Sequence, residues 1–180
     1  MSTKSIILVG LMGAGKTSVG RKLAEILDMD FIDADEEIVK AAGCSIEDIF
    51  QLYGESAFRD VEERVIQRLL EEGPHILASG GGAFMNPTTR ALIAEKSISV
   101  WLRVELDVLV RRTKRRGGRP LLKNKDPRET LKTLMDERYP IYIEADIVVD
   151  SKDEGPETTA QTIAAELGGL SKAVGREARS

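Results

Sequence analysis

The segment from Gly10 to Thr17 constrains the fold more than any other part of the chain. It reads GLMGAGKT and fits the pattern G-x-x-x-x-G-K-[ST], a loop that cradles phosphates. The apolar run 6–9 before it predicts a buried strand, and 16–27 after it carries apolar residues at helical spacing. Strand, loop and helix in this order are the context in which the pattern indicates a phosphate site.

The residue types of this loop indicate what it can hold. Glycines let backbone N–H groups curl around phosphate oxygens, and the helix that starts near Lys16 adds the positive end of its dipole. Lys16 is expected to contact the β and γ phosphates of a nucleotide, and Thr17 offers a hydroxyl to Mg²⁺. The predicted nucleotide-binding residues here are Gly13, Ala14, Gly15, Lys16, Thr17 and Ser18. A turn without a ligand is the alternative, and the loop alone does not separate a small-molecule kinase from a GTPase, a motor ATPase or a sulfotransferase-like relative.

Short apolar runs and helical patterns alternate along the rest of the chain. Further strands are predicted at 31–32, 76–78, 97–102 and 147–149, and helices at 46–53, 58–70, 88–94 and 158–167. Ser45 is available as an N-cap, although the residue three positions on is Asp48 and not the Glu or Gln of a capping box. The alternation predicts an α/β doubly wound fold, whose parallel sheet presents a site at the carboxyl ends of its strands.

Length and composition favour one domain, residues 1–180, with a core over 6–167 and a frayed tail over 168–180. A net charge of −4 gives little attraction for nucleic acid, and no apolar run approaches the roughly 20 residues that cross a bilayer. Cys44 is the single cysteine and cannot form an intramolecular disulfide. We expect a cytoplasmic monomer with no nucleic-acid or membrane partner.

Two acidic residues follow the second predicted strand. Asp33 and Asp35 stand two residues apart, so in an extended chain both would point to the same side, with Ala34 turned away. A carboxylate near Mg²⁺ could hold a metal-bound water, and one near an acceptor could orient a hydroxyl and accept its proton. The alternative is an acidic turn and helix start, which Glu36 and Glu37 support.

Two arginines and a run of glycines are candidates for binding an acid. Glu62 follows Arg59 by three residues and could steady its guanidinium, and an arginine so held can grip a carboxylate bidentately. In Gly80-Gly81-Gly82 the missing side chains would let a ligand approach backbone N–H groups, and Arg138 is a second candidate anion contact. Taken singly, each has a plain alternative: a surface ion pair, a loop and a solvated helix end.

Together these motifs resemble those of shikimate kinases over residues 6 to 156. The matching segments are GxxGAGKT at 10–17, DAD at 33–35, IF and GE..FR..E within 49–62, GGG at 80–82, RPLL at 119–122 and RYPIY at 138–142. Their order and spacing are far more specific than the phosphate loop, which many NTPases share. Ala34 stands where related enzymes often carry Ser or Thr, a departure that leaves the two acids in place.

The resemblance implies a three-layer P-loop NTPase fold with a central five-stranded parallel sheet, an acceptor-binding segment around 34–61 and a mobile lid around 113–125. It implies transfer of the γ-phosphoryl group of ATP to the 3-hydroxyl of shikimate, giving shikimate 3-phosphate and ADP in the pathway to chorismate and the aromatic amino acids. ATP and shikimate are the implied small-molecule partners, and Mg²⁺ is the implied cofactor.

The resemblance also assigns roles by position. Asp35 would hold shikimate hydroxyls and act as a base, and Asp33 would sit near Mg²⁺ through water together with Thr17. The residues assigned to the carboxylate and ring hydroxyls of shikimate are Arg59, Gly81, Gly82 and Arg138. Phe50 and Phe58 would form apolar walls of the acceptor pocket, although a helix-core role fits their spacing equally well.

A basic stretch precedes the last predicted strand and surrounds Gly117-Gly118. Its cations are Arg111, Arg112, Lys114, Arg115, Arg116 and Arg119. Such a loop could close over ATP, stabilise charge on the transferred group and exclude water. The resemblance gives that catalytic role, shared with Lys16 and Asp35, to Arg119, and it gives adenine stacking to Arg112 and adenine binding to 150–156. A solvated basic loop and a nucleic-acid patch are the alternatives on charge alone.

Two other functions fit parts of the sequence. A gluconate-type kinase would share the phosphate loop and lid but should lack the set of Asp35, Arg59, the three glycines and Arg138. A non-catalytic regulator would bind a nucleotide without turning over an acid, and Asn124-Lys125-Asp126 falls one residue short of the guanine-recognition pattern N-K-x-D. Cys44 has no metal-binding companion and His75 is the single histidine, so direct in-line transfer is expected.

Overall fold

In the residues that this computed structural model describes, 4–116 and 125–177, five parallel strands form one sheet of order β2-β3-β1-β4-β5. The strands are β1 (Ser5–Val9), β2 (Phe31–Asp33), β3 (Ile76–Ala78), β4 (Ser97–Arg103) and β5 (Ile147–Asp150). β1 is central, and its Ile6 lies opposite Ile76 of β3 and Ile98 of β4. The predicted parallel sheet is therefore confirmed, with one strand at each predicted apolar run.

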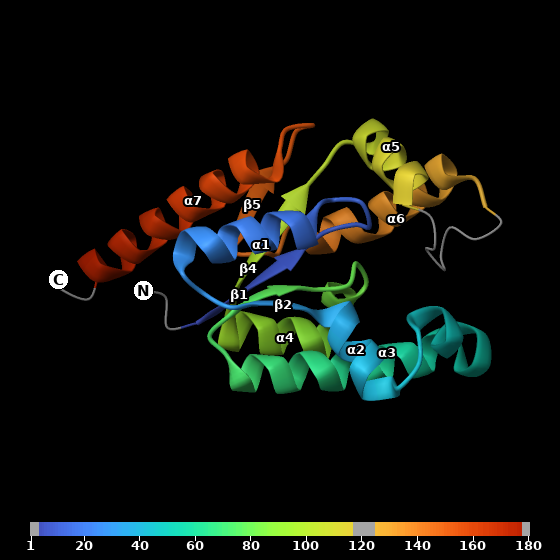
Figure 1. The fold of residues 1–180 in the computed structure, drawn as a ribbon. Coiled ribbons are helices and arrows are strands. Elements are labelled where there is room, and N and C mark those ends of the chain that lie inside the picture. The colour runs from blue at the N-terminus through green and yellow to red at the C-terminus, as the bar shows by residue number, and fades with distance from the viewer. Residues whose placement is uncertain (1–3, 117–124, 178–180) are drawn as a thin grey trace.

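Helices cover both faces of this sheet (Figure 1). They are α1 (Lys16–Leu27), α2 (Ala34–Ala42), α3 (Ile46–Glu72), α4 (Pro87–Lys96), α5 (Leu106–Arg116), α6 (Pro127–Tyr142) and α7 (Pro156–Glu177), with a 3₁₀ turn η1 (Ala83–Met85). α1 packs beside α7 on one face, and α3 packs beside α4 on the other. The three-layer architecture expected from the sequence is thus present.

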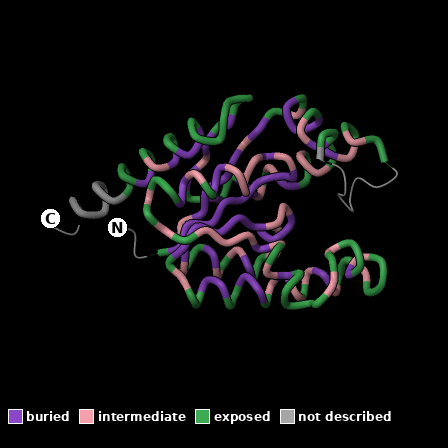
Figure 2. Tube along the Cα trace, viewed as in Figure 1, coloured by how far each residue is buried: buried purple, intermediate pink, exposed green. Residues whose placement is uncertain are grey.

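The core lies between these layers, where β1 contributes an uninterrupted apolar run. Residues 6–9 of β1 are each at most 1% exposed, and Leu23 of α1 and Ile66 of α3 are fully buried. Figure 2 shows the strands as a buried interior enclosed by helices whose outer faces are exposed. A strand covered on both faces has no alternation of polar residues, which is why the sequence reads as continuous apolar runs.

Several elements differ from their predicted bounds. The helices predicted over 46–53 and 58–70 form one element, α3, which is interrupted at Gly54 with φ of 85°. Ser45 does cap this element, because its Oγ accepts from the backbone N–H of Asp48 at 3.0 Å without any capping-box partner. α2, α5 and α6 were not among the predicted helices, and charged residues interrupt the apolar pattern of all three.

The last helix is also longer than predicted. Its sequence pattern indicates an end at Leu167, but α7 continues through Gly168 and Gly169 to Glu177. Glycine costs only about 1 kcal/mol in a helix interior, so packing of the preceding turns against α1 can carry the helix past it. Residues 168–177 of the expected frayed tail are therefore helical, and 178–180 lie outside the described residues.

None of the described helices combines the length and the apolar character that crossing a membrane requires.

His75 stands at the start of β3, far along the sheet from the glycines that follow this strand. Its side chain is 4% exposed, and burial lowers its pKa below the ordinary value of 6.5. The charges of Glu72 and Asp30 oppose this effect without reversing it. The folded protein therefore holds a neutral imidazole at a pH where the unfolded chain already binds a proton.

We expect the free energy of unfolding to fall as the pH drops from 7 to 5, and His75→Gln to make this fall shallower. The contribution of the neutral imidazole to the free energy of unfolding is fully present above pH 6.5 and is lost as the pH falls below that value. For one proton, the free energy of unfolding then falls by at most about 1.4 kcal/mol per pH unit. Urea unfolding at several pH values measures both slopes. Equal slopes would rule out this role for His75.

Candidate active site

The phosphate loop joins the central strand β1 to α1. Gly13 and Gly15 have φ of 82° and 91°, values that favour glycine, and Gly15 is the N-cap of α1. The Lys16 side chain folds back over the loop, where Nζ donates to the carbonyls of Gly10 at 2.7 Å and Leu11 at 3.0 Å. The loop is thus compact, with its ammonium group held beside the backbone that precedes α1.

A pocket of about 310 Å³ opens beside this loop. It is lined by Gly13, Ala14, Gly15, Ser18, Val19, Arg112, Arg115, Ser151, Asp153, Glu154, Pro156 and Thr159. Arg112 reaches from α5 and donates through Nη1 to the carbonyls of Gly13 at 3.2 Å and Ala14 at 3.3 Å. The loop after β5, predicted to meet adenine, therefore lies across the same pocket from the phosphate loop.

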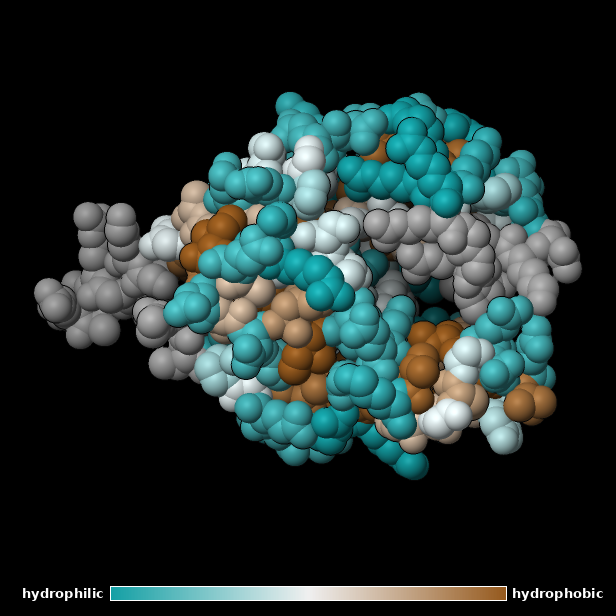
Figure 3. Space-filling view, viewed as in Figure 1, coloured by the Kyte–Doolittle hydropathy of each residue, from teal (hydrophilic) through white to brown (hydrophobic). Residues whose placement is uncertain are grey.

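Ion pairs attach α5 to the loop after β5. Arg111 lies 2.8 Å from a carboxylate oxygen of Asp153, and Arg112 lies 3.8 Å from the other. The surface over α5 is hydrophilic in Figure 3. Arg111, Lys114 and Arg115 of this helix are exposed. Residues 113–116 of the predicted lid belong to this helix. Residues 117–124, with Arg119 and the RPLL segment, lie outside the described residues, as does the side chain of Arg116.

Asp33 ends β2 and joins two elements. Its Oδ2 accepts from Thr17 Oγ1 at 2.8 Å, and its Oδ1 accepts from the backbone N–H of Asp35 at 2.9 Å as the N-cap of α2. The two predicted metal-site residues, Thr17 and Asp33, are therefore in direct contact.

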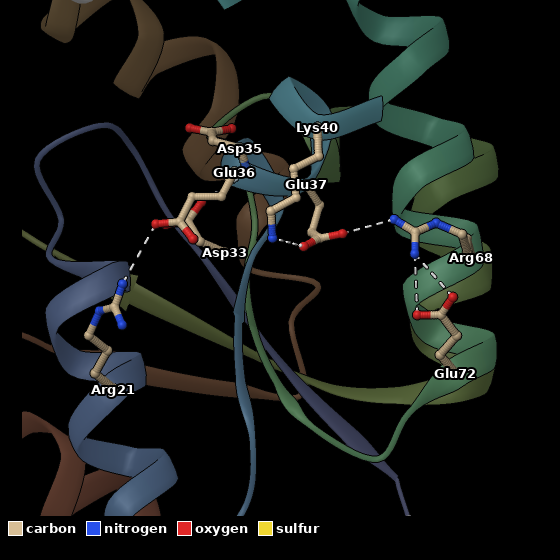
Figure 4. A network of polar contacts seen from close by, with 8 residues as sticks. All are labelled: Arg21, Asp33, Asp35, Glu36, Glu37, Lys40, Arg68 and Glu72. Carbon is tan, nitrogen blue, oxygen red and sulfur yellow. Dashed lines mark hydrogen bonds and ion pairs between the residues drawn. The ribbon is translucent and has the colours of Figure 1, made fainter. Parts of the chain in front are cut away.

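The predicted extended geometry of Asp33 and Asp35 is wrong. The chain enters α2 at Ala34, which is fully buried, so Asp35 lies in the first helical turn and its carboxylate points away from that of Asp33 (Figure 4). The acidic helix start, weighed as the alternative, is the local structure. It separates the two acids, because Asp33 contacts Thr17 and Asp35 faces a second pocket.

Exposed ion pairs attach α2 to its neighbours. Arg21 of α1 lies 3.7 Å from Glu36, and Arg68 of α3 lies 3.0 Å from Glu37, as Figure 4 shows. Lys40 adds a second partner for Glu37 at 2.9 Å, and together Lys40 and Arg68 lower the pKa of that carboxyl. Such surface pairs are each worth little, so they contribute little to the position of α2.

The second pocket, of about 90 Å³, collects the predicted acceptor residues. It is lined by Met12, Asp35, Ile46, Phe50, Phe58, Arg59, Glu62, Gly80, Gly81, Gly82 and Arg138. Phe50 and Phe58 pack with ring centroids 4.8 Å apart and form its apolar side. Met12 belongs to the phosphate loop, so this pocket adjoins the loop from the side opposite α5.

Arg59 and Arg138 present their guanidinium groups at this pocket. Arg59 Nη1 donates to Glu62 Oε1 at 2.8 Å, and its Nη2 lies 3.3 Å from Glu55. Arg138 on α6 is 7% exposed, so the alternative of a solvated helix end is wrong. Burial raises the pKa of Glu62, which is 2% exposed, while the charge of Arg59 and its hydrogen bond oppose that rise.

A side chain at any of the three glycines would displace the end of one of these charged side chains. A Cβ on Gly80 would lie 2.6 Å from Glu62 Oε2, one on Gly81 would lie 2.9 Å from Arg138 Nη1, and one on Gly82 would lie 2.4 Å from both terminal nitrogens of Arg59. The glycine run therefore admits two guanidinium groups and a carboxylate against the backbone, which is more specific than an ordinary loop.

Some lining residues were not predicted from the sequence. Met12 and Ile46 in the second pocket, and Thr159 in the first, carry no distinguishing pattern. Met12 could have been suspected because it lies within the phosphate loop. Thr159 is buried and lies 3.3 Å from Ser151 through their hydroxyls, a contact that depends on how α7 packs.

A parallel sheet with a phosphate loop after its central strand, and an arginine-lined pocket beside that loop, define a P-loop kinase of the nucleoside-monophosphate-kinase-like fold. The family model described as shikimate kinase matches residues 12–168, and this chain belongs to the shikimate kinase family. A shikimate kinase of Paramagnetospirillum magneticum is 56% identical over 156 residues, which are 87% of this chain and 80% of that protein.

Solved structures agree with this membership. A shikimate kinase from Acinetobacter baumannii in complex with shikimate superposes with a TM-score of 0.90 at 36% identity, covering 93% of this chain and 94% of that one. A gluconokinase from Sinorhizobium meliloti gives a TM-score of 0.61 at 21% identity, covering 97% of each chain, a likeness that shows a shared fold alone.

We expect Gly82→Ala to leave the fold intact and to displace the Arg59 guanidinium. Gly82 has φ of −93° and ψ of −8°, which alanine adopts without strain, so the added methyl acts through its 2.4 Å approach to the arginine. A crystal structure would show the guanidinium moved by about 1 Å or more, the gap to an ordinary contact of about 3.5 Å.

Gly168→Ala is the matched control, because no atom lies within 4 Å of its Cβ position and alanine favours the helix by about 1 kcal/mol. An Arg59 left in its original place by Gly82→Ala would contradict the steric argument.

Proposed function

We propose that this protein transfers the γ-phosphoryl group of ATP to the 3-hydroxyl of shikimate, giving ADP and shikimate 3-phosphate. The observation that carries the proposal is the adjacency of two pockets across the phosphate loop. Gly13 lines the pocket that fits a nucleotide, and Met12, its neighbour in the chain, lines the pocket that contains Arg59, Arg138 and Asp35. A phosphoryl group bound at the loop would thus lie between donor and acceptor.

The acceptor pocket suits a small hydroxylated acid. Arg59 and Arg138 offer planar donors for a carboxylate, and Gly81 and Gly82 line the same pocket, where a ring hydroxyl would lie. Phe50 and Phe58 provide an apolar wall for the ring. Asp35 accepts a hydrogen bond from the reacting hydroxyl in this proposal, and it orients that hydroxyl and receives its proton.

Lys16 and the loop would act on the donor. The Lys16 ammonium rests on the carbonyls of Gly10 and Leu11, and it can turn to the β and γ phosphates when a nucleotide binds. Backbone N–H groups at the start of α1 add positive dipole charge where the phosphates would lie. Arg112 closes the pocket toward the adenine side. Arg119 would contact the transferred phosphoryl group, although this residue lies outside the described residues.

Thr17 and Asp33 fit a Mg²⁺ ion. Their oxygens lie 2.8 Å apart at the start of α1, and hydroxyl and carboxylate oxygens are the ligands this hard cation prefers. Proteins usually hold Mg²⁺ with one or two carboxylates together with substrate phosphates and water. When bound, the ion offsets charge on the nucleotide phosphates.

The remaining parts of the proposal concern the whole chain. One kinase domain with an acceptor segment around 34–61 and a closing lid around 113–125 stays a proposal, as do the monomeric state and the cytoplasmic location. The acceptor segment coincides with α2 and the first half of α3, which meet at Gly43 to Ser45 and supply Asp35, Phe50 and Arg59.

Purified protein with ATP and Mg²⁺ is expected to release ADP when shikimate is added, and to release little with gluconate or with no acceptor. Mass spectrometry of the product identifies shikimate phosphate. ADP release with gluconate alone would favour the gluconate-type kinase, and ATP binding without turnover of either acid would favour a regulator.

We expect Arg59→Ala to weaken shikimate binding about tenfold or more while nucleotide binding stays within twofold, because a charged hydrogen bond of about 1.5–3 kcal/mol is lost at one pocket. Titration calorimetry with each ligand measures the two affinities. Arg68→Ala is the matched control on the same helix, since Arg68 pairs with Glu37 and Glu72 on the surface. An equal loss of both affinities in Arg59→Ala would contradict the assigned role.

A further inference from the structure

Tyr142 lies directly behind the acceptor pocket without lining it. It is the last residue of α6 and follows Arg138 by four positions, so the two side chains lie on one face of the helix. Tyr142 is fully buried, and its hydroxyl donates to the carbonyl oxygen of Gly81. The Tyr142 hydroxyl thus connects α6, which carries Arg138, to the middle glycine of the run.

The ring of Tyr142 is held on several sides. Phe84, two residues after the glycine run, lies 6.3 Å away between ring centroids, and Trp101 of β4 lies 5.7 Å away. Tyr139 is the third aromatic neighbour, at 6.1 Å. Because sheet, helix and 3₁₀ turn all contribute to this cluster, the phenol hydroxyl has a fixed position relative to β3 and α6.

The phenol also stays protonated at ordinary pH. Burial raises the pKa of Tyr142 to about 12, while the charge of Arg138 and a hydrogen bond with it oppose that rise. The hydroxyl therefore has a hydrogen to donate to Gly81 throughout the range in which a kinase would be assayed. Arg138 also adjoins this glycine, because a Cβ on Gly81 would lie 2.9 Å from Arg138 Nη1, so the Tyr142 hydroxyl and the Arg138 guanidinium both lie against the Gly81 backbone.

We propose that Tyr142 is a positioning residue for the acceptor, holding the Gly81 backbone and the Arg138 guanidinium at a fixed separation. The proposal rests on the proposed function, since those two groups are the ones expected to meet shikimate. A loose Gly81 carbonyl would let the glycine run shift away from Arg138, and a ligand would then have to restore the arrangement as it binds. The cost would fall on acceptor binding and leave the nucleotide pocket unchanged.

Tyr139 supplies a matched control. It lies on the same helix and in the same aromatic cluster, and its hydroxyl also donates to a backbone carbonyl, that of Val104 at 2.7 Å. Val104 follows β4, which β1 separates from β3 and its glycine run in the sheet, and it lines neither of the two pockets. Removing either hydroxyl takes one oxygen from the same cluster, but only Tyr142 is connected to the acceptor pocket.

The test compares steady-state kinetics of the wild type, Tyr142→Phe and Tyr139→Phe. We expect Tyr142→Phe to raise KM for shikimate about tenfold, the effect of losing one well-placed hydrogen bond, with KM for ATP within twofold of the wild type. Tyr139→Phe should leave both KM values unchanged. An unchanged KM for shikimate in Tyr142→Phe, or equal changes in both substrates, would overturn the proposal.

A second variant keeps the test decisive if Tyr142→Phe does not fold. Replacing Tyr142 with 3,5-difluorotyrosine retains the ring and hydroxyl but lowers the pH at which the phenol ionises. We expect KM for shikimate to rise with the phenolate absorbance, because a phenolate cannot donate to Gly81, while the wild type shows no such rise. A KM that stays at the wild-type value through that ionisation would contradict the proposal. Absence of shikimate turnover in the wild type would instead overturn the proposed function, and this inference with it.

Discussion

The parallel pairing of β1 with both β3 and β4 is the constraint on which the rest of the structure depends. It places the carboxyl end of β1, where the phosphate loop begins, beside the glycine run that follows β3. β2 pairs with the outer edge of β3 and brings Asp33 to the same end of the sheet. Three segments distant in sequence therefore converge, because parallel strands all end on one edge.

The phosphate loop separates two pockets that differ in chemistry. On one side α5 and the loop after β5 surround a space bordered by backbone and by Arg112. On the other side buried charges face each other, with Arg59 against Glu62 and with Arg138 and Asp35 nearby. Charges in a poorly solvated pocket interact strongly, so this arrangement favours an anionic ligand that completes the pairing of the two arginines.

The acceptor pocket depends on small residues as much as on charged ones. The glycine run lets Arg59, Arg138 and Glu62 reach the backbone, and buried Ala34 leaves room where α2 begins. Tyr142 then occupies the space behind the run, supported by Phe84 and Trp101. Positions that bear no reactive group thus decide where the reactive groups lie.

The sequence by itself determined the phosphate loop, the strands, most helices and many of the residues that line the two pockets. It could do so because a G-x-x-x-x-G-K-[ST] loop is a contiguous motif, and strands buried on both faces appear in the sequence as continuous apolar runs. The departure of Asp35 from Asp33, the passage of α3 past Gly54, the length of α7 and the contact of Tyr142 with Gly81 were decided by the tertiary structure. Each of these depends on packing between segments far apart in sequence, which local propensity does not encode.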